Sequence, residues 1–295
     1  MKKRIKLLAI ISLVFIMIIA LTGCEEKKKE NDNYKIVTSF YPIYIMTSNI
    51  TKSANNIELS NMADINAGCI HDYTLQPTDL KKIEKADVFI ENGLGIESFN
   101  DKLTNSFKKL DIINSSKNIN GLVEDEGEIN GHTWTSIDNY ISQIDVIKEE
   151  LKQKNSENSS IYEKNAQEYK EKLISIKERY NNELSNLKGK KVVLLNEAFA
   201  YLLKDLKMET IDLHTDHEES AISAENLKNI LSEMKEKNIN IIIIDKDDNE
   251  KNAQMIEKET GAKIYKLNSC LRGEIDNDSY IKAMTENLEI LKQIN

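Results

Sequence analysis

Short apolar runs alternate with helical patterns over most of the chain. The runs of the first half lie around a helical segment from Tyr44 to Ile50 and another that begins near Thr78, and they read YKIVTSF, NIELSNMADI, ADVFIENG and LDIINSS. The second half repeats this rhythm with KVVLLN, METIDL, INIIIID and AKIYKL, separated by helical stretches such as SAENLKNILSEMKEKN. Short apolar runs between helices are typical of strands in α/β units. The pattern therefore predicts an α/β fold with two halves, each built on a parallel sheet.

The stretch between the two halves has a different pattern. Residues 136–187 are rich in charge and contain no glycine, which predicts one long helix, or two if NSENSS interrupts it. The C-terminal SYIKAMTENLEILKQI is amphipathic and is expected to close the fold. We therefore expect an N-terminal α/β lobe over residues 34–135, a long linking helix region over 136–187 and a C-terminal α/β lobe over 188–295. A ligand cleft is expected between the lobes.

The composition is that of a globular protein with an acidic surface. Of the 295 residues, 40% are hydrophobic and 30% are charged, so the chain is too apolar to be disordered. The formal net charge is −9, although the first 23 residues carry four lysines or arginines and no acid. The remaining chain is therefore more acidic than the total indicates. This balance argues against a nucleic-acid partner and is compatible with a cationic ligand.

The N-terminus resembles a bacterial lipoprotein signal peptide. The cationic MKKRIK precedes the apolar LLAIISLVFIMIIAL, and LTGC follows, so we expect cleavage after residue 23 and a lipid on Cys24. The alternative, an uncleaved transmembrane anchor, leaves Cys24 without a role. In both cases the folded part lies outside the cytoplasm, and in the first it is anchored to the bacterial cell membrane. Residues 24–33 are polar and without hydrophobic periodicity, which predicts a tether.

Potential metal ligands follow several of the predicted strands. Two of the four histidines lie in GCIHDYTLQPTDL and NGHTWTSIDNY, at His71 and His132. LLNEAFAYLLKDL, where the fifth strand meets a helix, contains Asn196 and Glu197. KLNSCLRG, at the end of the last strand, contains Asn268 and Cys270. Ligands in open α/β sheets bind beyond the carboxyl ends of the strands. Imidazole is a common metal ligand and also an ordinary hydrogen-bonding group, so spacing alone leaves both interpretations open.

The chain resembles the metal-binding lipoproteins of zinc and manganese ABC importers, known as cluster A-I or cluster 9 solute-binding proteins. The resemblance extends from about Lys35 to the C-terminus. It rests on HDYTLQPTDLKKIEKADVFIENGLGIESF, GHTWTS, NEAFAYLLKDL, HEESAISAENLKNI and SYIKAMTENLEILK. The family fold that the resemblance implies has two α/β lobes joined by a rigid long helix, with metal in the cleft between them.

The resemblance assigns the family's ligand positions to this chain one by one. His71 and His132 match the first two family histidines, Asn196 stands where the family has its third histidine, and Asn268 stands near a family aspartate. An amide oxygen binds Zn²⁺ more weakly than imidazole or carboxylate does. A working site in this chain therefore requires other ligands.

Three groups of residues are candidates for this compensation. Cys69 and Cys270 flank ligand positions and could supply thiolates to a Cys₂His₂ site, but outside the cytoplasm we favour a disulfide between them. Glu197 is the second candidate, although neighbouring residues of a strand point to opposite faces. The third is HTDHEES, which contains His214 and His217 and which we interpret instead as the entry to a helix from Ser223.

The resemblance implies an extracytoplasmic solute-binding protein that captures a divalent metal ion and delivers it to an ABC importer permease. Nitrogen and sulfur ligands favour Zn²⁺ over Mn²⁺. We expect a monomer that binds no nucleic acid. The alternative is a degenerate family member that acts as a surface adhesin or protein-binding module, with weak or no metal binding. An enzyme is not expected, because the sequence contains no GxSxG, HExxH or phosphate-loop motif.

Overall fold

The computed structural model describes residues 33–294 apart from residues 69, 72, 126 and 213–223. The compact unit that contains both sheets begins at Tyr34. Within the described residues, no helix combines the length and the apolar character needed to cross a membrane. The predicted signal peptide and Cys24 lie outside the described residues.

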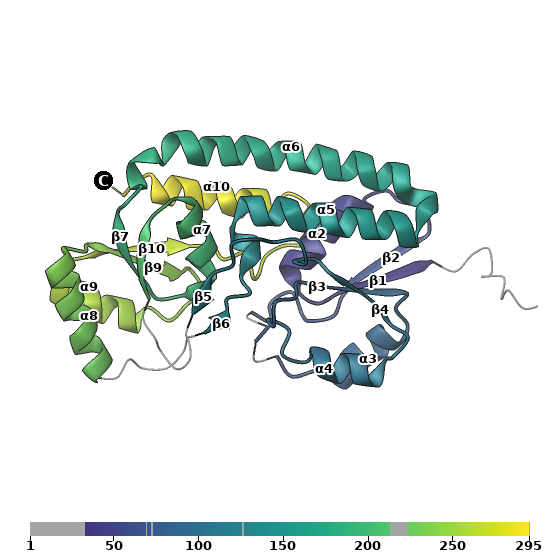
Figure 1. Ribbon diagram of the computed structural model, residues 1–295, viewed down its shortest axis with the longest axis horizontal. Helices are drawn as coiled ribbons and strands as arrows, with labels where there is room; N and C mark the ends of the chain where they lie inside the picture. The colour runs from purple at the N-terminus through teal and green to yellow at the C-terminus, as the bar shows by residue number, and fades with distance from the viewer. Residues whose placement is uncertain (1–32, 69, 72, 126, 213–223, 295) are drawn as a thin grey trace, which may run out of the picture. The chain divides into compact units, whose positions relative to one another are not determined.

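The first half of the chain forms a parallel four-stranded sheet in the order β2-β1-β3-β4 (Figure 1). Its strands are β1 (Tyr34–Thr38), β2 (Ile57–Asn61), β3 (Val88–Glu91) and β4 (Asp111–Asn114). The connecting helices are α2 (Tyr41–Thr51), α3 (Pro77–Glu84) and α4 (Asn100–Ser106). Strand β3 is buried along its whole length, as expected of an inner strand covered on both faces. The carboxyl ends of β1 and β3 are thereby brought side by side.

The second half forms another parallel four-stranded sheet, in the order β10-β9-β7-β8. Its strands are β7 (Lys191–Leu194), β8 (Glu209–Asp212), β9 (Ile241–Asp245) and β10 (Lys263–Leu267), and its helices are η4 (Glu197–Phe199), α7 (Ala200–Asp205), α8 (Ala224–Lys237) and α9 (Lys251–Thr260). A short antiparallel pair, β5 (Glu124–Asp125) and β6 (Glu128–Ile129), precedes the turn η1 (Thr133–Thr135). The fold is therefore α/β with two parallel sheets, as the sequence predicts.

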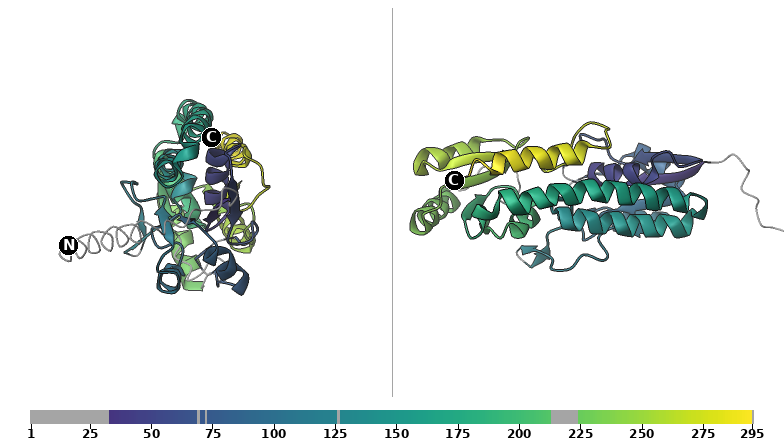
Figure 2. Two further views of the ribbon diagram at one scale, coloured as in Figure 1. Left: turned by 90° about the vertical axis from the view of Figure 1, so that its right-hand side faces the viewer. Right: turned by 90° about the horizontal axis from the view of Figure 1, so that it is seen from above.

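Two long helices connect the halves, and the break that NSENSS indicates is present. Helix α5 (Ile137–Lys154) is followed by the turn η2 (Ser156–Asn158), helix α6 (Ser159–Glu183) and the turn η3 (Ser185–Leu187). The Oγ atom of Ser136 accepts a hydrogen bond from the Asn139 amide at 3.2 Å and caps the start of α5. Figure 2 shows α6 alongside both α5 and the last helix, α10 (Ser279–Leu291), with which it is in contact. Helix α6 also contacts α2 of the first half and thus packs against elements of both halves.

One hydrophobic core runs through both sheets and the long helices. At its centre the rings of Tyr140 on α5 and Tyr280 on α10 stack with centroids 3.6 Å apart, and the Tyr280 hydroxyl donates to the Trp134 carbonyl at 2.8 Å. A second, smaller cluster lies where α8 and α9 pack on the C-terminal sheet. The shared core holds η1, which follows His132, between the two halves.

Candidate metal centre

His132 is fully buried at the start of η1 and is held by Asn130. The Asn130 Oδ1 atom accepts a hydrogen bond from the His132 amide at 2.8 Å and lies 3.0 Å from its Nδ1 atom. A proton on Nδ1 satisfies the second contact and leaves the lone pair on Nε2. Burial lowers the pKa of His132 well below its usual value, and the neighbouring His71 lowers it further by a smaller amount. His132 is therefore a neutral imidazole at neutral pH, which is the form that binds metal.

His71 lies in the loop between β2 and α3 and faces His132. The two imidazole rings have centroids 5.0 Å apart and an interplanar angle of 58°. The Ser98 hydroxyl donates to the His71 carbonyl at 2.6 Å. Downstream of His71, Pro77 begins α3 behind a capping box between Gln76 and Asp79. The loop is thus fixed near its histidine and again at the helix that follows.

Glu197 completes a group of three potential ligands. Ligand atoms of His71, His132 and Glu197 all lie within 4.8 Å of one another. Asn130 joins two of these residues, because its Nδ2 atom donates to the Glu197 carbonyl at 3.0 Å. Among the residues that the structure describes, this is the one group of three or more His, Cys, Asp or Glu side chains with this spacing.

Strand alternation does not set the orientation of Glu197, because this residue lies beyond the end of the strand. Strand β7 ends at Leu194, and Glu197 is the first residue of the 3₁₀-helix η4. Asn196 and Glu197 are therefore not consecutive strand residues, and the opposite orientation of strand neighbours imposes nothing on them.

The Asn196 side chain is hydrogen-bonded to two residues of the C-terminal half. Its Oδ1 atom accepts from the Ala198 amide at 3.0 Å and caps η4, and its Nδ2 atom donates to Asp248 at 2.9 Å. Both polar groups of the buried amide thus have protein partners. These contacts favour a structural role over metal binding for Asn196.

Asn268 and Cys270 form a turn at the end of β10. The Asn268 Oδ1 atom accepts from the Cys270 amide at 2.9 Å, and the Asn268 carbonyl accepts from Asn287 at 2.9 Å. Cys270 carries a free, buried thiol, and burial raises its pKa. A thiolate is therefore unfavourable at Cys270.

The predicted Cys₂His₂ set and the predicted disulfide both require Cys69, which lies outside the described residues. The pairing therefore stays a prediction. HTDHEES, with His214 and His217, also lies outside the described residues, so its interpretation as a helix entry is not tested.

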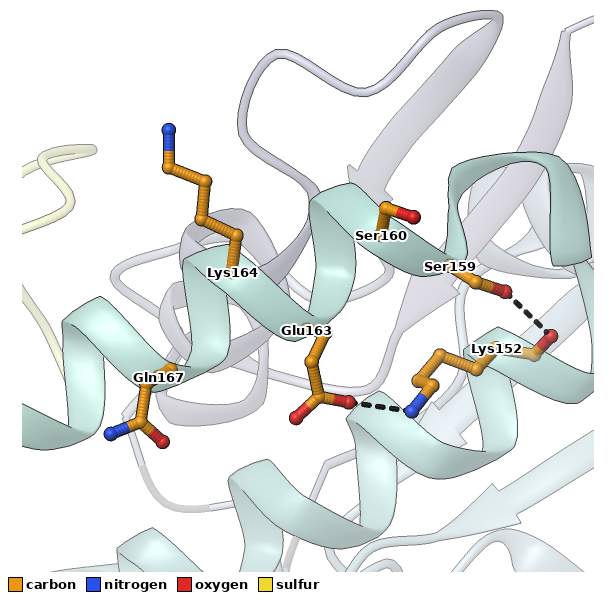
Figure 3. Close-up of a pocket in the computed structure, with 6 residues that line it drawn as sticks. All are labelled: Lys152, Ser159, Ser160, Glu163, Lys164 and Gln167. Carbon is orange, nitrogen blue, oxygen red and sulfur yellow. Dashed lines mark hydrogen bonds and ion pairs between the residues drawn. The ribbon is translucent and has the colours of Figure 1, made fainter.

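A separate surface hollow lies at the bend between α5 and α6 (Figure 3). The side chains around it come from these two helices, and Lys152 donates to Glu163 at 2.5 Å across it. None of the three potential metal ligands lines this hollow. It is therefore distinct from the histidine site.

Asn130 and Trp134 hold His132, and neither is among the predicted site residues. Asn130 precedes His132 by two positions, and this Asn-X-His spacing is the one local signal of its role. Trp134 contacts the His132 ring with centroids 5.1 Å apart and donates from Nε1 to the Ser269 carbonyl at 2.9 Å. The tryptophan thereby connects the site to the C-terminal half.

Comparison with known proteins identifies the family. Residues 36–294 match the family described as zinc-uptake complex component A, periplasmic. The zinc-binding lipoprotein AdcA of Streptococcus pneumoniae is 29% identical over 315 residues, which cover 99% of this chain and 61% of AdcA. The chain therefore spans about three fifths of the length of that relative. The high-affinity zinc uptake system protein ZnuA of Bacillus subtilis is 26% identical, with 97% of this chain and 96% of ZnuA covered.

A solved structure agrees with these relatives. The Zn(II)-bound ZnuA-like domain of S. pneumoniae AdcA superposes with a TM-score of 0.74 at 27% identity, covering 88% of this chain and 98% of that domain. The family match extends over nearly the whole described part of the chain and includes both histidine loops. The chain belongs to the zinc-uptake complex component A family.

Proposed function

We propose that this protein captures a zinc ion with His71, His132 and Glu197 and delivers it to the permease of an ABC importer. The observation that carries the proposal is the convergence of the three ligand atoms within 4.8 Å. Two neutral imidazoles and one carboxylate form a donor set that suits Zn²⁺, whereas Mn²⁺ favours more oxygen ligands. In this proposal Glu197 supplies the ligand that Asn196 does not.

The anchoring and the partners belong to the same proposal. The N-terminal pattern that ends in LTGC supports a lipid on Cys24 and a site outside the cytoplasm. The relative AdcA is itself called a lipoprotein, and ZnuA of B. subtilis is called part of a zinc uptake system. The protein would act as a single chain that presents its ion to the membrane permease.

Calorimetric titration with Zn²⁺ tests the ligand assignment. Removing one of three protein ligands should weaken binding by roughly 100-fold or more, or about 2.7 kcal/mol, in His71→Ala and in Glu197→Ala. The matched control is Asn196→Ala, the neighbouring residue, for which we expect less than about a 10-fold change because its amide is hydrogen-bonded to Ala198 and Asp248. A Glu197→Ala variant that binds zinc as tightly as the parent would show that the carboxylate is not a ligand. Competition with Mn²⁺ in the same titration tests the preference for zinc.

A further inference from the structure

Glu97 is a buried carboxylate at the end of the N-terminal sheet. It is 2% exposed, and three donors converge on it. Its Oε1 atom accepts from the Ser39 hydroxyl at 2.8 Å and the Asn92 amide at 2.7 Å, and its Oε2 atom accepts from the Gly93 amide at 2.9 Å. Ser39 follows β1, and Asn92 follows β3. Glu97 thus joins the carboxyl ends of two neighbouring strands.

The loop that Glu97 closes is in contact with His71. Ser98, the next residue, donates its hydroxyl to the His71 carbonyl at 2.6 Å. The position of Ser98 depends on the loop from Asn92 to Glu97, whose two ends are joined by the hydrogen bonds to the carboxylate. Glu97 therefore acts on the backbone of His71 through one hydroxyl group.

Asn92 connects the same loop to His132. Its side-chain amide has all four hydrogen-bonding positions filled. The Nδ2 atom donates to the Gly93 carbonyl at 3.0 Å and the Gly131 carbonyl at 2.9 Å. The Oδ1 atom accepts from Thr133 at 3.2 Å and Gln143 at 2.9 Å. Gly131 and Thr133 are the two neighbours of His132, so Asn92 holds the backbone on one side of the buried ligand and a side chain on the other.

A packing contact brings the two loops together independently of these hydrogen bonds. A Cβ atom added to Gly131 would lie 2.8 Å from the Cβ atom of Ile96, closer than such atoms approach in proteins. Ile96 is fully buried and belongs to the loop that Glu97 closes. The loop that carries His132 therefore lies against the Asn92–Ser98 loop at a distance that only glycine permits.

We propose that Glu97 is a positioning residue for metal capture: through Ser98 and Asn92 it holds His71 and His132 at the separation that zinc requires before the ion arrives. The inference rests on the proposed zinc-binding function of these two histidines. A ligand pair that is already in place loses less conformational entropy on binding, so the affinity is higher.

The three hydrogen-bond donors around position 97 explain why a carboxylate stands there. Three donors face its two oxygens, and an unpaired buried donor is unfavourable. A glutamine has one oxygen and one NH₂ group, so it would turn a donor toward at least one of the amide or hydroxyl donors. Glu97→Gln should therefore release part of the loop without changing the volume of the side chain.

The test compares Glu97→Gln with the matched control Glu91→Gln. Glu91 is also a buried carboxylate at the end of β3, but its Oε2 atom accepts from Asn100 on α4 and, among the described residues, from neither histidine loop. We expect Glu97→Gln to raise the zinc dissociation constant by roughly 10- to 100-fold, as for residues that orient metal ligands. Glu91→Gln should change it less than about 3-fold.

Hydrogen exchange on the metal-free protein is a second readout, which does not depend on zinc. In Glu97→Gln the amides of Asn92, Gly93 and residues 131–133 should exchange faster than in the parent, while amides of α6 should not. Ser98→Ala provides a mild variant, since the Ser98 side chain lies at the surface. It should weaken zinc binding several-fold, and its effect should be less than additive with that of Glu97→Gln because both act on His71.

The outcomes separate the inference from the proposed function. If the parent binds zinc and both Glu97→Gln and Ser98→Ala bind it equally well, the positioning role is wrong and the proposed function stands. If Glu97→Gln fails to fold, an unchanged zinc affinity in Ser98→Ala is sufficient to overturn the inference. A parent protein that binds no zinc overturns the proposed function and the inference with it.

Discussion

At the scale of single residues, a shift of one position decides the chemistry of the site. The resemblance implies a family histidine at the position of Asn196, yet the side-chain amide of this asparagine caps η4 and binds Asp248. The adjacent Glu197 lies instead with His71 and His132. The shift is possible because β7 has already ended and the chain turns into a 3₁₀-helix at Glu197. In the proposed site a carboxylate thus takes the place of the imidazole that the resemblance implies.

Gly131 offers a test of the close approach between the two loops. In Gly131→Ala the new Cβ atom would meet Ile96 at 2.8 Å, so the loop of His132 must move away from the Asn92–Ser98 loop. We expect a loss of about 1–3 kcal/mol in the free energy of unfolding, as for other overpacked sites. We also expect weaker zinc binding in calorimetric titration, because the separation of the histidines changes.

The control for this variant is Gly127→Ala. Gly127 has a φ of 88° and no atom within 4 Å of an added Cβ, so the substitution strains the backbone without moving the histidine loops. Its unfolding free energy should fall by about 1 kcal/mol while zinc affinity is unchanged. Parent-like zinc affinity in Gly131→Ala would contradict the proposed importance of the contact.

At the scale of elements, α5 and α6 are joined at their bend by charged side chains. Lys148 is nearly buried, with 8% of its side chain exposed, and its Nζ atom lies 2.9 Å from Glu149, 3.1 Å from Glu163 and 3.4 Å from Asp145. Glu163 also accepts from Lys152 at 2.5 Å, as Figure 3 shows. One lysine therefore connects carboxylates of both helices in a partly desolvated place.

Removing Lys148 should weaken the pairing of the two helices. In Lys148→Met the carboxylates of Asp145 and Glu163 lose the cation between them, and we expect a loss of about 1–2 kcal/mol in urea unfolding at low salt. The exposed Lys164, which is 3.8 Å from Glu168, is the control, and Lys164→Met should cost less than about 0.5 kcal/mol. Equal losses in the two variants would show that burial of Lys148 adds nothing to its ion pairs.

At the scale of the whole molecule, one core joins both halves and limits how they move. The hydrogen bond from Trp134 to Ser269 joins the turn after His132 to the C-terminal half, and the stack of Tyr140 on Tyr280 joins the linking helix α5 to α10. Opening the site by a rigid-body movement of the sheets would break these buried contacts. The arrangement favours a site that is formed before the ion binds, in keeping with the role inferred for Glu97.

The raised pKa of Glu97 makes the stability of the whole protein depend on pH. Burial and the like charge of Glu91 raise the pKa of Glu97 to about 7, although hydrogen bonds from Asn92, Ser39 and Gly93 oppose the shift. In the unfolded chain the same carboxyl should titrate near its usual value. Between these two pKa values the folded state binds more protons than the unfolded state, so the free energy of unfolding falls as the pH rises.

The stabilisation that the folded state gains from the protonated Glu97 is fully present below about pH 4.5 and is lost as the pH rises through about 7. The total is at most about 3 kcal/mol. The Glu97→Gln variant has no titrating carboxyl group at this position, so its free energy of unfolding should depend less on pH over this range. Urea unfolding of the metal-free parent and variant at pH values from 5 to 8 measures the difference, and parallel curves for the two proteins would contradict the prediction.

The sequence by itself determined the two parallel sheets, the break between the long helices and the two histidines that follow strands. These features are readable because they depend on local periodicity, on turn residues and on the order of elements along the chain. The family resemblance added the pairing of His71 with His132, since residues far apart in sequence carry no local sign that they meet.

Only the tertiary structure decided that Glu197, and not Asn196, lies beside the two histidines. It also decided which residues hold the histidines in place. In IENGLGIESF, Glu97 has the appearance of an ordinary loop residue, and nothing local shows that it is buried against Ser39, 58 positions away. Alternation along a strand predicts the face of a side chain only up to the last paired residue. Beyond that point, the orientation of Glu197 and the burial of Glu97 depend on packing between distant loops, which periodicity does not encode.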